Sequence, residues 1–224
     1  MSTTPAPGCV LPAAFFARDT VAVARELLGK VLQSTVAGEQ VSGRIVETEA
    51  YLGSLDPGSH ASTRGMTKRN SVMFGPAGHA YVYFTYGNHH MLNIVTECDG
   101  VAGAVLVRAL EPLDGLEVMA RRRSAIRRSG RPLSPRDLAN GPGKLAAALG
   151  IDLSRNREAL DGTGSLVVYD APAPDEPIAS SGRIGLSEGH ELDLRFYLEG
   201  DPYVSRGDIG PRRRPPRPQG EGTK

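Results

Sequence analysis

The sequence is poor in several residue types, and each scarcity excludes a class of protein. Its 224 residues include no tryptophan and only two cysteines, Cys9 and Cys98. Neither cysteine lies in a Cys-X-X-Cys or Cys-His cluster, so we expect two free thiols in a reducing compartment and no metal site. No apolar run approaches the roughly 20 residues of a membrane-spanning helix. The N-terminus lacks a basic segment followed by an apolar one, so a secretion signal is not expected and the default location is the cytoplasm.

Lysine is also scarce. Only four of the 26 basic residues are lysines, and many of the 22 arginines cluster between residues 121 and 131 and between 212 and 217. A net charge of +1 argues against strong non-specific binding to DNA, although the distribution of charge matters more than its sum. Runs of like charge are commonly only solvated surface. The charge pattern therefore leaves binding to nucleic acid open.

The length suits one sizeable domain, which we place at residues 13–206 between flexible tails at 1–12 and 207–224. We expect helices at 20–28, from Pro112 to about Ser129, from Ser134 for one short turn, and at 145–149. The expected strands are 30–37, 40–49, 79–86, 90–96, 103–110, 165–169, 183–186 and 194–198. Clustered strands with interspersed helices favour an α+β fold with a largely antiparallel sheet.

One charged residue interrupts an apolar strand. Arg108 follows the run 104–107, and a buried arginine needs a partner because an unpaired buried charge is very costly. The partner could form a plain core ion pair, or Arg108 could hold a catalytic carboxylate ionised. Glu49 is the natural candidate, at the end of an apolar strand and just before a long polar loop. Glu47 points to the same face of that strand.

Aromatic and amide side chains surround the next expected hairpin. Tyr81, Tyr83 and Tyr86 flank its turn, and Tyr51 could form a second wall opposite them. These rings could simply cover a sheet, or they could stack on bases and wedge between base steps. Asn93 lies in a buried run and must be hydrogen-bonded, either to a neighbouring backbone or to a substrate edge.

Four segments occur in an order that resembles the alkyladenine (3-methyladenine) DNA glycosylase family. They are Arg44–Tyr51 (RIVETEAY), Tyr81–Gly87 (YVYFTYG), Val107–Pro112 (VRALEP) and Gly141–Leu145 (GPGKL). The resemblance is collinear from about residue 27 to 206 and includes a late segment at 195–206. Each motif alone is modest, but four in this order are specific.

The resemblance implies a role for each matching residue near the reacting bond. Glu49 corresponds to the general base that activates water, and Arg108 to the residue that helps hold this water and the glutamate. Tyr51, His60 and Tyr83 correspond to the walls of a pocket for a flipped base, to which His60 donates a hydrogen bond.

Other matching residues concern selectivity and DNA. Asn93 corresponds to a residue that excludes normal purines with an extra exocyclic amine, guanine above all. Tyr86 corresponds to the side chain that inserts into the minor groove. Arg69 and Lys144 fall at or near positions that contact the DNA backbone.

The resemblance also implies the fold and the activity. It implies a single α+β domain around a curved, mainly antiparallel sheet with a protruding β-hairpin, and no metal or cofactor. We predict a monomeric, monofunctional glycosylase that removes alkylated or deaminated purines from duplex DNA in base excision repair. A hydrolase of free nucleosides would use the same bond chemistry without Tyr86. A non-catalytic nucleic-acid-binding module would bind DNA without releasing a base.

Overall fold

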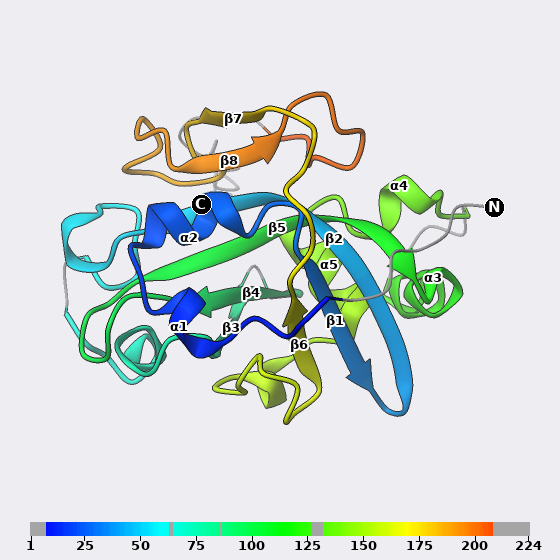
Figure 1. Ribbon diagram of the computed structural model, residues 1–224, viewed down its shortest axis with the longest axis horizontal. Helices are drawn as coiled ribbons and strands as arrows, with labels where there is room; N and C mark the ends of the chain where they lie inside the picture. The colour runs from blue at the N-terminus through cyan, green and yellow to red at the C-terminus, as the bar shows by residue number, and fades with distance from the viewer. Residues whose placement is uncertain (1–7, 63–64, 86, 127–131, 208–224) are drawn as a thin grey trace, which may run out of the picture.

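The protein folds around one curved sheet with short helices packed against it (Figure 1). The computed structural model describes residues 8–62, 65–85, 87–126 and 132–207. Its strands are β1 (Val31–Val36), β2 (Glu39–Tyr51), β3 (Ala80–Thr85), β4 (His89–Val95), β5 (Ala104–Asp114), β6 (Leu166–Tyr169), β7 (Ile178–Ser181) and β8 (Arg195–Leu198). Its helices are α1 (Ala13–Phe16), α2 (Thr20–Glu26), α3 (Leu116–Ala125), α4 (Pro135–Leu138) and α5 (Pro142–Leu149), with single turns η1 (Gly53–Leu55), η2 (Ser71–Phe74) and η3 (Leu153–Arg155).

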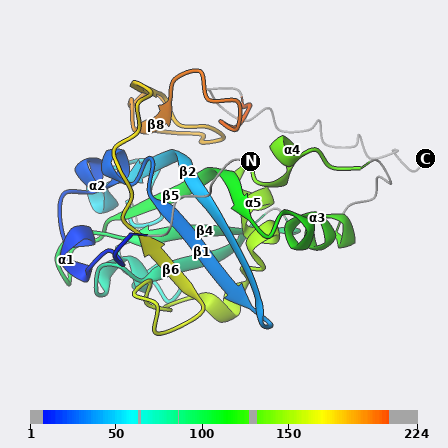
Figure 2. The ribbon, with the colours of Figure 1, turned by 45° about the vertical axis from the view of Figure 1, so that its right-hand side comes forward.

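The sheet is centred on the long strand β2. The main order is β3-β4-β5-β2-β1-β6, and the pair β7–β8 joins through β8. The first part of β2 pairs with β1, residues 47–49 pair with β8, and β5 follows the opposite edge, all antiparallel. Irregular register around Glu47 marks β-bulges, which bend a strand, and both views show β2 and β5 as curved ribbons (Figures 1 and 2). The predicted α+β class with a curved antiparallel sheet is confirmed.

Two helices close the core on this sheet. Helix α2 begins where the sequence predicts, because the Asp19 side chain caps it by accepting a hydrogen bond from the backbone N–H of Ala22. Helix α5 ends at Gly150, whose φ of 71° is typical of a glycine that stops a helix. The buried faces of both helices belong to one hydrophobic cluster with the inner residues of β1, β2, β4 and β5. The predicted helices at these two places are confirmed.

The predicted start of a helix at Pro112 is wrong. Strand β5 continues through Pro112 to Asp114, and α3 begins only at Leu116, after Gly115 in a left-handed conformation. Pro112 lies opposite Gly43, next to a register shift in the β2–β5 pairing. Proline lacks an N–H and is tolerated at such irregularities, so long-range pairing overrides the local helix signal here. The expected end of this helix near Ser129 lies outside the described residues.

The predicted strand at 183–186 is also wrong. These residues form part of a loop between β7 and β8, and Gly185 within it has a φ of 76° that a regular strand does not allow. The short strand β7 comes just before the loop and is absent from the prediction. Its sequence, Ile-Ala-Ser-Ser, carries only a weak signal for a strand.

Several expectations concern the ends of the chain. In the segment expected as an N-terminal tail, Val10 pairs with Tyr169 and Leu11 is buried, so residues 10 and 11 pack against β6. Residues 1–7, Tyr86 and 208–224 lie outside the part that the structure describes. Cys9 and Cys98 are both free thiols, as predicted. Both side chains are exposed. Within the described ranges, no helix has the length and apolar character to cross a membrane.

Candidate active site

The two glutamates of β2 share one arginine. Glu49 is completely buried, and its Oε1 lies 3.1 Å from Nη1 of Arg108 on the neighbouring strand β5. The same guanidinium donates from Nε to Oε1 of Glu47 at 3.0 Å. The ion pair predicted between Arg108 and Glu49 is therefore present, and Glu47 is part of it. Burial would lower the pKa of Arg108, but the charges of Glu49 and Glu47 outweigh it and raise the pKa above the usual value.

Three groups hold the Glu49 carboxylate. Besides Arg108, the backbone N–H of Ile184 donates to Oε1 and the Tyr51 hydroxyl donates to Oε2, each at 2.8 Å. Burial and the nearby Glu49 charge raise the pKa of Tyr51 well above its usual value, so this phenol keeps its proton at neutral pH. All three neighbours donate to the carboxylate oxygens, so together they hold the Glu49 carboxylate in one orientation.

Glu47 is surrounded more completely. Its Oε1 accepts hydrogen bonds from Arg108, from Nε of Arg195 at 2.6 Å and from the Ser205 hydroxyl at 2.9 Å, while Oε2 accepts the backbone N–H of Ser205 at 2.7 Å. Burial alone would raise the pKa of Glu47, but Arg108 and Arg195, followed by Ser205, hold it below its ordinary value. The donors around Glu47 leave little room for a reacting water.

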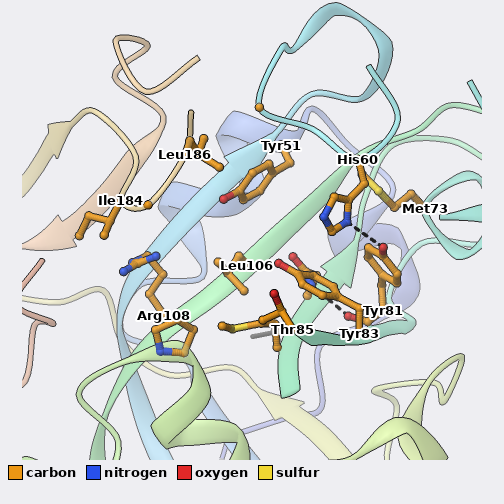
Figure 3. Close-up of a pocket in the computed structure, with 15 residues that line it drawn as sticks. Tyr51, His60, Met73, Tyr81, Tyr83, Thr85, Leu106, Arg108, Ile184 and Leu186 are labelled. Atoms are coloured by element: carbon orange, nitrogen blue, oxygen red, sulfur yellow. Dashed lines mark hydrogen bonds between the residues drawn. The ribbon is translucent and has the colours of Figure 1, made fainter. Parts of the chain in front are cut away.

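A pocket of about 240 Å³ lies beside this pair (Figure 3). A water molecule occupies roughly 30 Å³ in the liquid, so the pocket has room for a single small ring system. Tyr51, His60, Tyr83, Asn93 and Arg108, all predicted from the sequence, contribute to its walls. Glu49 itself lies behind Tyr51 and Arg108. The structure thus brings together the six residues predicted for catalysis and base binding.

His60 stands at the mouth of the pocket against two tyrosines. Its ring packs edge-on to Tyr83 with centroids 4.6 Å apart, and its Nδ1 lies 2.9 Å from the Tyr81 hydroxyl. Partial burial of the ring, and next the charge of Arg69, lower the pKa of His60 to about 4. His60 is therefore neutral at physiological pH. The prediction gave Tyr81 no role in the pocket, although its alternation with Tyr83 along β3 was visible.

Asn93 makes the backbone contact that was one of the two alternatives left open by the sequence, and its contact with a substrate edge stays a prediction. It is 3% exposed, and its Nδ2 donates to the backbone carbonyl of Tyr81 at 3.0 Å. It also lines the pocket. The backbone bond fixes the amide plane, so the side chain presents a rigid edge to whatever occupies the pocket.

Two of the residues expected to contact DNA, Arg69 and Lys144, do not line the pocket. The exposed Arg69 places its guanidinium 5.4 Å from the centre of the Tyr83 ring. Lys144 lies in the first turn of α5, where its Nζ donates to Oδ1 of Asn140 at 2.7 Å, and it borders a surface hollow together with Arg136 and Arg206. Tyr86 is outside the described residues. The DNA-binding roles of Arg69, Lys144 and Tyr86 stay predictions.

A buried carboxylate held by an arginine, beside an aromatic pocket for one ring system, defines an enzyme site for a planar heterocycle. Over residues 14–202 the chain matches the methylpurine-DNA glycosylase (MPG) family. The chain belongs to this family, and it is a hydrolase of N-glycosyl bonds that acts in DNA repair.

Full-length relatives agree with this assignment. The chain is 45% identical over 215 residues to a protein of Chlorobaculum tepidum, covering 96% of this chain and 98% of the relative. It is 52% identical over 201 residues to a protein of Methanoculleus marisnigri, covering 88% and 98%. A protein of Carboxydothermus hydrogenoformans is 46% identical over 200 residues, covering 88% and 99%. Each of the three bears the name "Putative 3-methyladenine DNA glycosylase".

Proposed function

We propose that the protein is a monofunctional glycosylase that flips damaged purines out of duplex DNA and releases them with an activated water. The substrate class comprises 3-methyladenine, 7-methylguanine, hypoxanthine and ethenoadenine. The observation that carries this proposal is the buried Glu49, held by Arg108, Tyr51 and Ile184 directly behind the aromatic pocket. The protein acts as a monomer in the cytoplasm, on the DNA of the nucleoid, through the unit 13–206.

The pocket walls suit a flipped purine. Tyr51 and Tyr83 offer ring faces on which a base can stack. The Tyr81 hydroxyl lies 2.9 Å from Nδ1 of the neutral His60. In the tautomer in which the Tyr81 O–H donates to Nδ1, the hydrogen of the His60 ring is on Nε2. His60 in this form donates a hydrogen bond to an acceptor nitrogen of the base, and Asn93 at the opposite side rejects an extra exocyclic amine.

The chemistry follows from the position of the carboxylate. Glu49 takes a proton from a water whose oxygen bonds to C1′ of the sugar, while the electrons of the C1′–N bond leave with the base. The transition state carries positive charge on the sugar, which a nearby carboxylate stabilises. A purine alkylated on N3 or N7 is already cationic and leaves as a neutral molecule. Because Arg108, Tyr51 and Ile184 cover Glu49, the water has to enter beside Arg108 at the pocket wall.

One carboxylate and one water favour direct displacement, by analogy with inverting glycosidases. Glu47 does not serve as a second acid or base, because it already accepts four hydrogen bonds. A lyase step would need an amine nucleophile. Among the described lysines, Lys30 pairs with Asp170, Lys144 bonds Asn140, and neither these nor Lys68 lines the pocket. The product is therefore an abasic site with an intact strand.

On the DNA side, we assign Tyr86 to the minor groove, where its ring fills the space of the flipped nucleotide, and Arg69 and Lys144 to backbone contacts. Arg69 lies over the ring of Tyr83, a residue of the pocket wall, and Lys144 lies in the first turn of α5. Tyr86 follows directly after β3, the strand that carries Tyr81 and Tyr83.

The test is base release from duplexes that each carry one lesion, with the same lesions supplied as free nucleosides for comparison. We expect the wild type to release the base from duplexes much faster than from nucleosides, and Glu49→Gln to release almost none while still binding the duplex. Equal rates on nucleosides would instead indicate a nucleoside hydrolase. Normal release by Glu49→Gln would refute the role of Glu49.

A further inference from the structure

A second arginine, Arg183, is completely buried next to the pocket. Arg183 and Asp56 each have a side chain with 0% exposure, and their bidentate contacts measure 2.5 and 2.6 Å. The guanidinium also donates to the backbone carbonyls of Ala50 at 2.9 Å and Gly189 at 3.0 Å. Burial would lower the pKa of Arg183, but the hydrogen bond and charge of Asp56 outweigh it and raise the pKa, so Arg183 keeps its charge.

Two glycines make the space for this guanidinium. A Cβ atom built on Gly58 would lie 2.7 Å from Nη2 of Arg183, and one built on Gly189 would lie 2.9 Å from the same atom. Asp56 in turn accepts the backbone N–H groups of Leu52 and Gly58, so it also fixes the loop after β2. The guanidinium thus packs directly against the backbone at Gly58 and Gly189, with no room for a side chain at either position.

The same guanidinium lies next to two of the three groups that hold Glu49. It stacks 4.7 Å from the centre of the Tyr51 ring, and it is not itself among the residues that line the pocket. Arg183 also directly precedes Ile184, whose N–H donates to Glu49. Residues 182–190, which we call the pocket loop, place Ile184 and Leu186 along the pocket on the side away from His60 (Figure 3).

We propose that Arg183 and Asp56 are positioning residues, which lock the pocket loop and Tyr51 in the one arrangement that orients the Glu49 carboxylate. The pair joins the end of β2, the loop at 52–58 and the pocket loop. Its five contacts with them are the hydrogen bonds to Ala50, Leu52, Gly58 and Gly189 and the stacking on Tyr51. Arg108 is held by Glu47 and by the Ser205 hydroxyl, neither of which contacts Arg183 or Asp56. Loss of the Arg183 anchor therefore misplaces Ile184 and Tyr51 but leaves the Arg108–Glu49 ion pair in place.

The first arm of the test does not depend on activity. Hydrogen exchange of the pocket loop is compared in the wild type, Arg183→Lys and Gly58→Ala, the last of which crowds the guanidinium from outside the pocket loop without removing it. We expect exchange of the amides at 183–189 to accelerate about tenfold or more in both variants, while β8 exchanges as before. Unchanged exchange in both variants would overturn the proposal.

The second arm measures function and rests on the proposed function. A hydrogen bond to a charged group is worth about 1.5–3 kcal/mol, so the single-turnover rate on a methylated duplex should fall about 10- to 100-fold in Arg183→Lys. Binding to a duplex with an uncleavable abasic analogue should change by less than about threefold, because the DNA-facing residues are untouched.

The matched control is Arg44→Lys. Arg44 lies on strand β2 and pairs with Glu111, Glu176 and Asp201, away from the active-site pocket. It should keep the wild-type rate once the active fraction is corrected by titration with the abasic analogue. If Arg183→Lys has the same rate as this control, the Arg183–Asp56 pair contributes only to stability, and the proposal is overturned. If the wild type releases no base at all, the proposed function fails, and the exchange arm still decides whether the anchor exists.

Discussion

Glu47 and Glu49 lie two residues apart on one strand, share Arg108 and are both inaccessible to solvent, yet their surroundings differ. Around Glu47, two arginines and both the backbone and hydroxyl of Ser205 meet the carboxylate. Around Glu49, one arginine, one phenol and one backbone N–H do so, and all three donor residues line the pocket. Charge and burial alone therefore do not distinguish the carboxylate that we propose as catalytic from the one to which we assign a structural role. The number of donors and their distance from the pocket do.

The difference has a physical consequence. A carboxylate that accepts four hydrogen bonds contributes to stability, because removing its charge leaves the buried Arg195 without a counter-charge. A carboxylate with fewer donors can exchange one of them for water, and it can take a proton from that water. The two residues should respond in opposite ways to the same substitution.

The largest expected effect is on the activity of Glu49→Gln. Loss of a general base costs about 10²- to 10⁴-fold in rate, while Arg108 keeps Glu47 as its partner and the fold persists. Single-turnover base release and thermal unfolding should be measured on the same preparation. A variant that loses stability as much as activity would contradict the division of roles between the two glutamates.

Glu47→Gln should mainly lower the free energy of unfolding. Breaking a buried pair costs about 3–5 kcal/mol, because Arg195 is left buried without a carboxylate and Arg108 keeps only Glu49. Urea unfolding followed by circular dichroism gives this value. At a temperature where the variant is folded, it should retain far more activity than Glu49→Gln, and the reverse order would break the comparison.

Ser205→Ala should have a smaller effect of the same kind. It removes the hydroxyl that donates to Glu47 but keeps the backbone N–H, so we expect a loss of about 1–2 kcal/mol in stability. Urea unfolding measures the loss, and base release should stay near the wild-type rate. A large loss of rate with little loss of stability would place Ser205 in the reaction instead.

The pH dependence of the unfolding free energy should also report the contribution of Glu47. The pKa of Glu47 is lowered in the folded protein, so its contribution is present above about pH 4.5, its unfolded value, and is lost as the pH falls below it. The difference in unfolding free energy between wild type and Glu47→Gln should thus be largest at neutral pH and shrink toward acid pH. A difference that grows on acidification would contradict the sign of this shift.

The smallest effect concerns His60, on the opposite wall of the pocket. Because its pKa is lowered to about 4, a nuclear magnetic resonance titration of its ring should show no change near pH 6.5. The Arg69→Gln variant removes the second cause of the shift and should raise the midpoint. Assignment of the ring signal by His60→Gln provides the control, and a midpoint near 6.5 in the wild type would refute the described packing.

The sequence determined much of this protein through local signals. The alternating aromatics of β3, the apolar runs of β2 and β5, the capping Asp19 and the terminating Gly150 encode their elements directly, because each depends on neighbours within a few residues. The motifs around Glu49, Tyr83 and Arg108 also identified the family and the pocket walls, and the lone charge in an apolar strand called for a buried partner.

Tertiary structure alone decided the rest. Pro112 stays in a strand because Gly43, far away in the chain, pairs with it, and residues 183–186 form a loop because Asp56 draws Arg183 inward. The backbone N–H of Ile184 has no signature in its side chain, so its role on Glu49 could not be read from residue types. The contacts of Arg183 with Asp56 and of Ile184 with Glu49 join residues more than 120 positions apart. Only the folded chain brings these donors and acceptors within hydrogen-bonding distance.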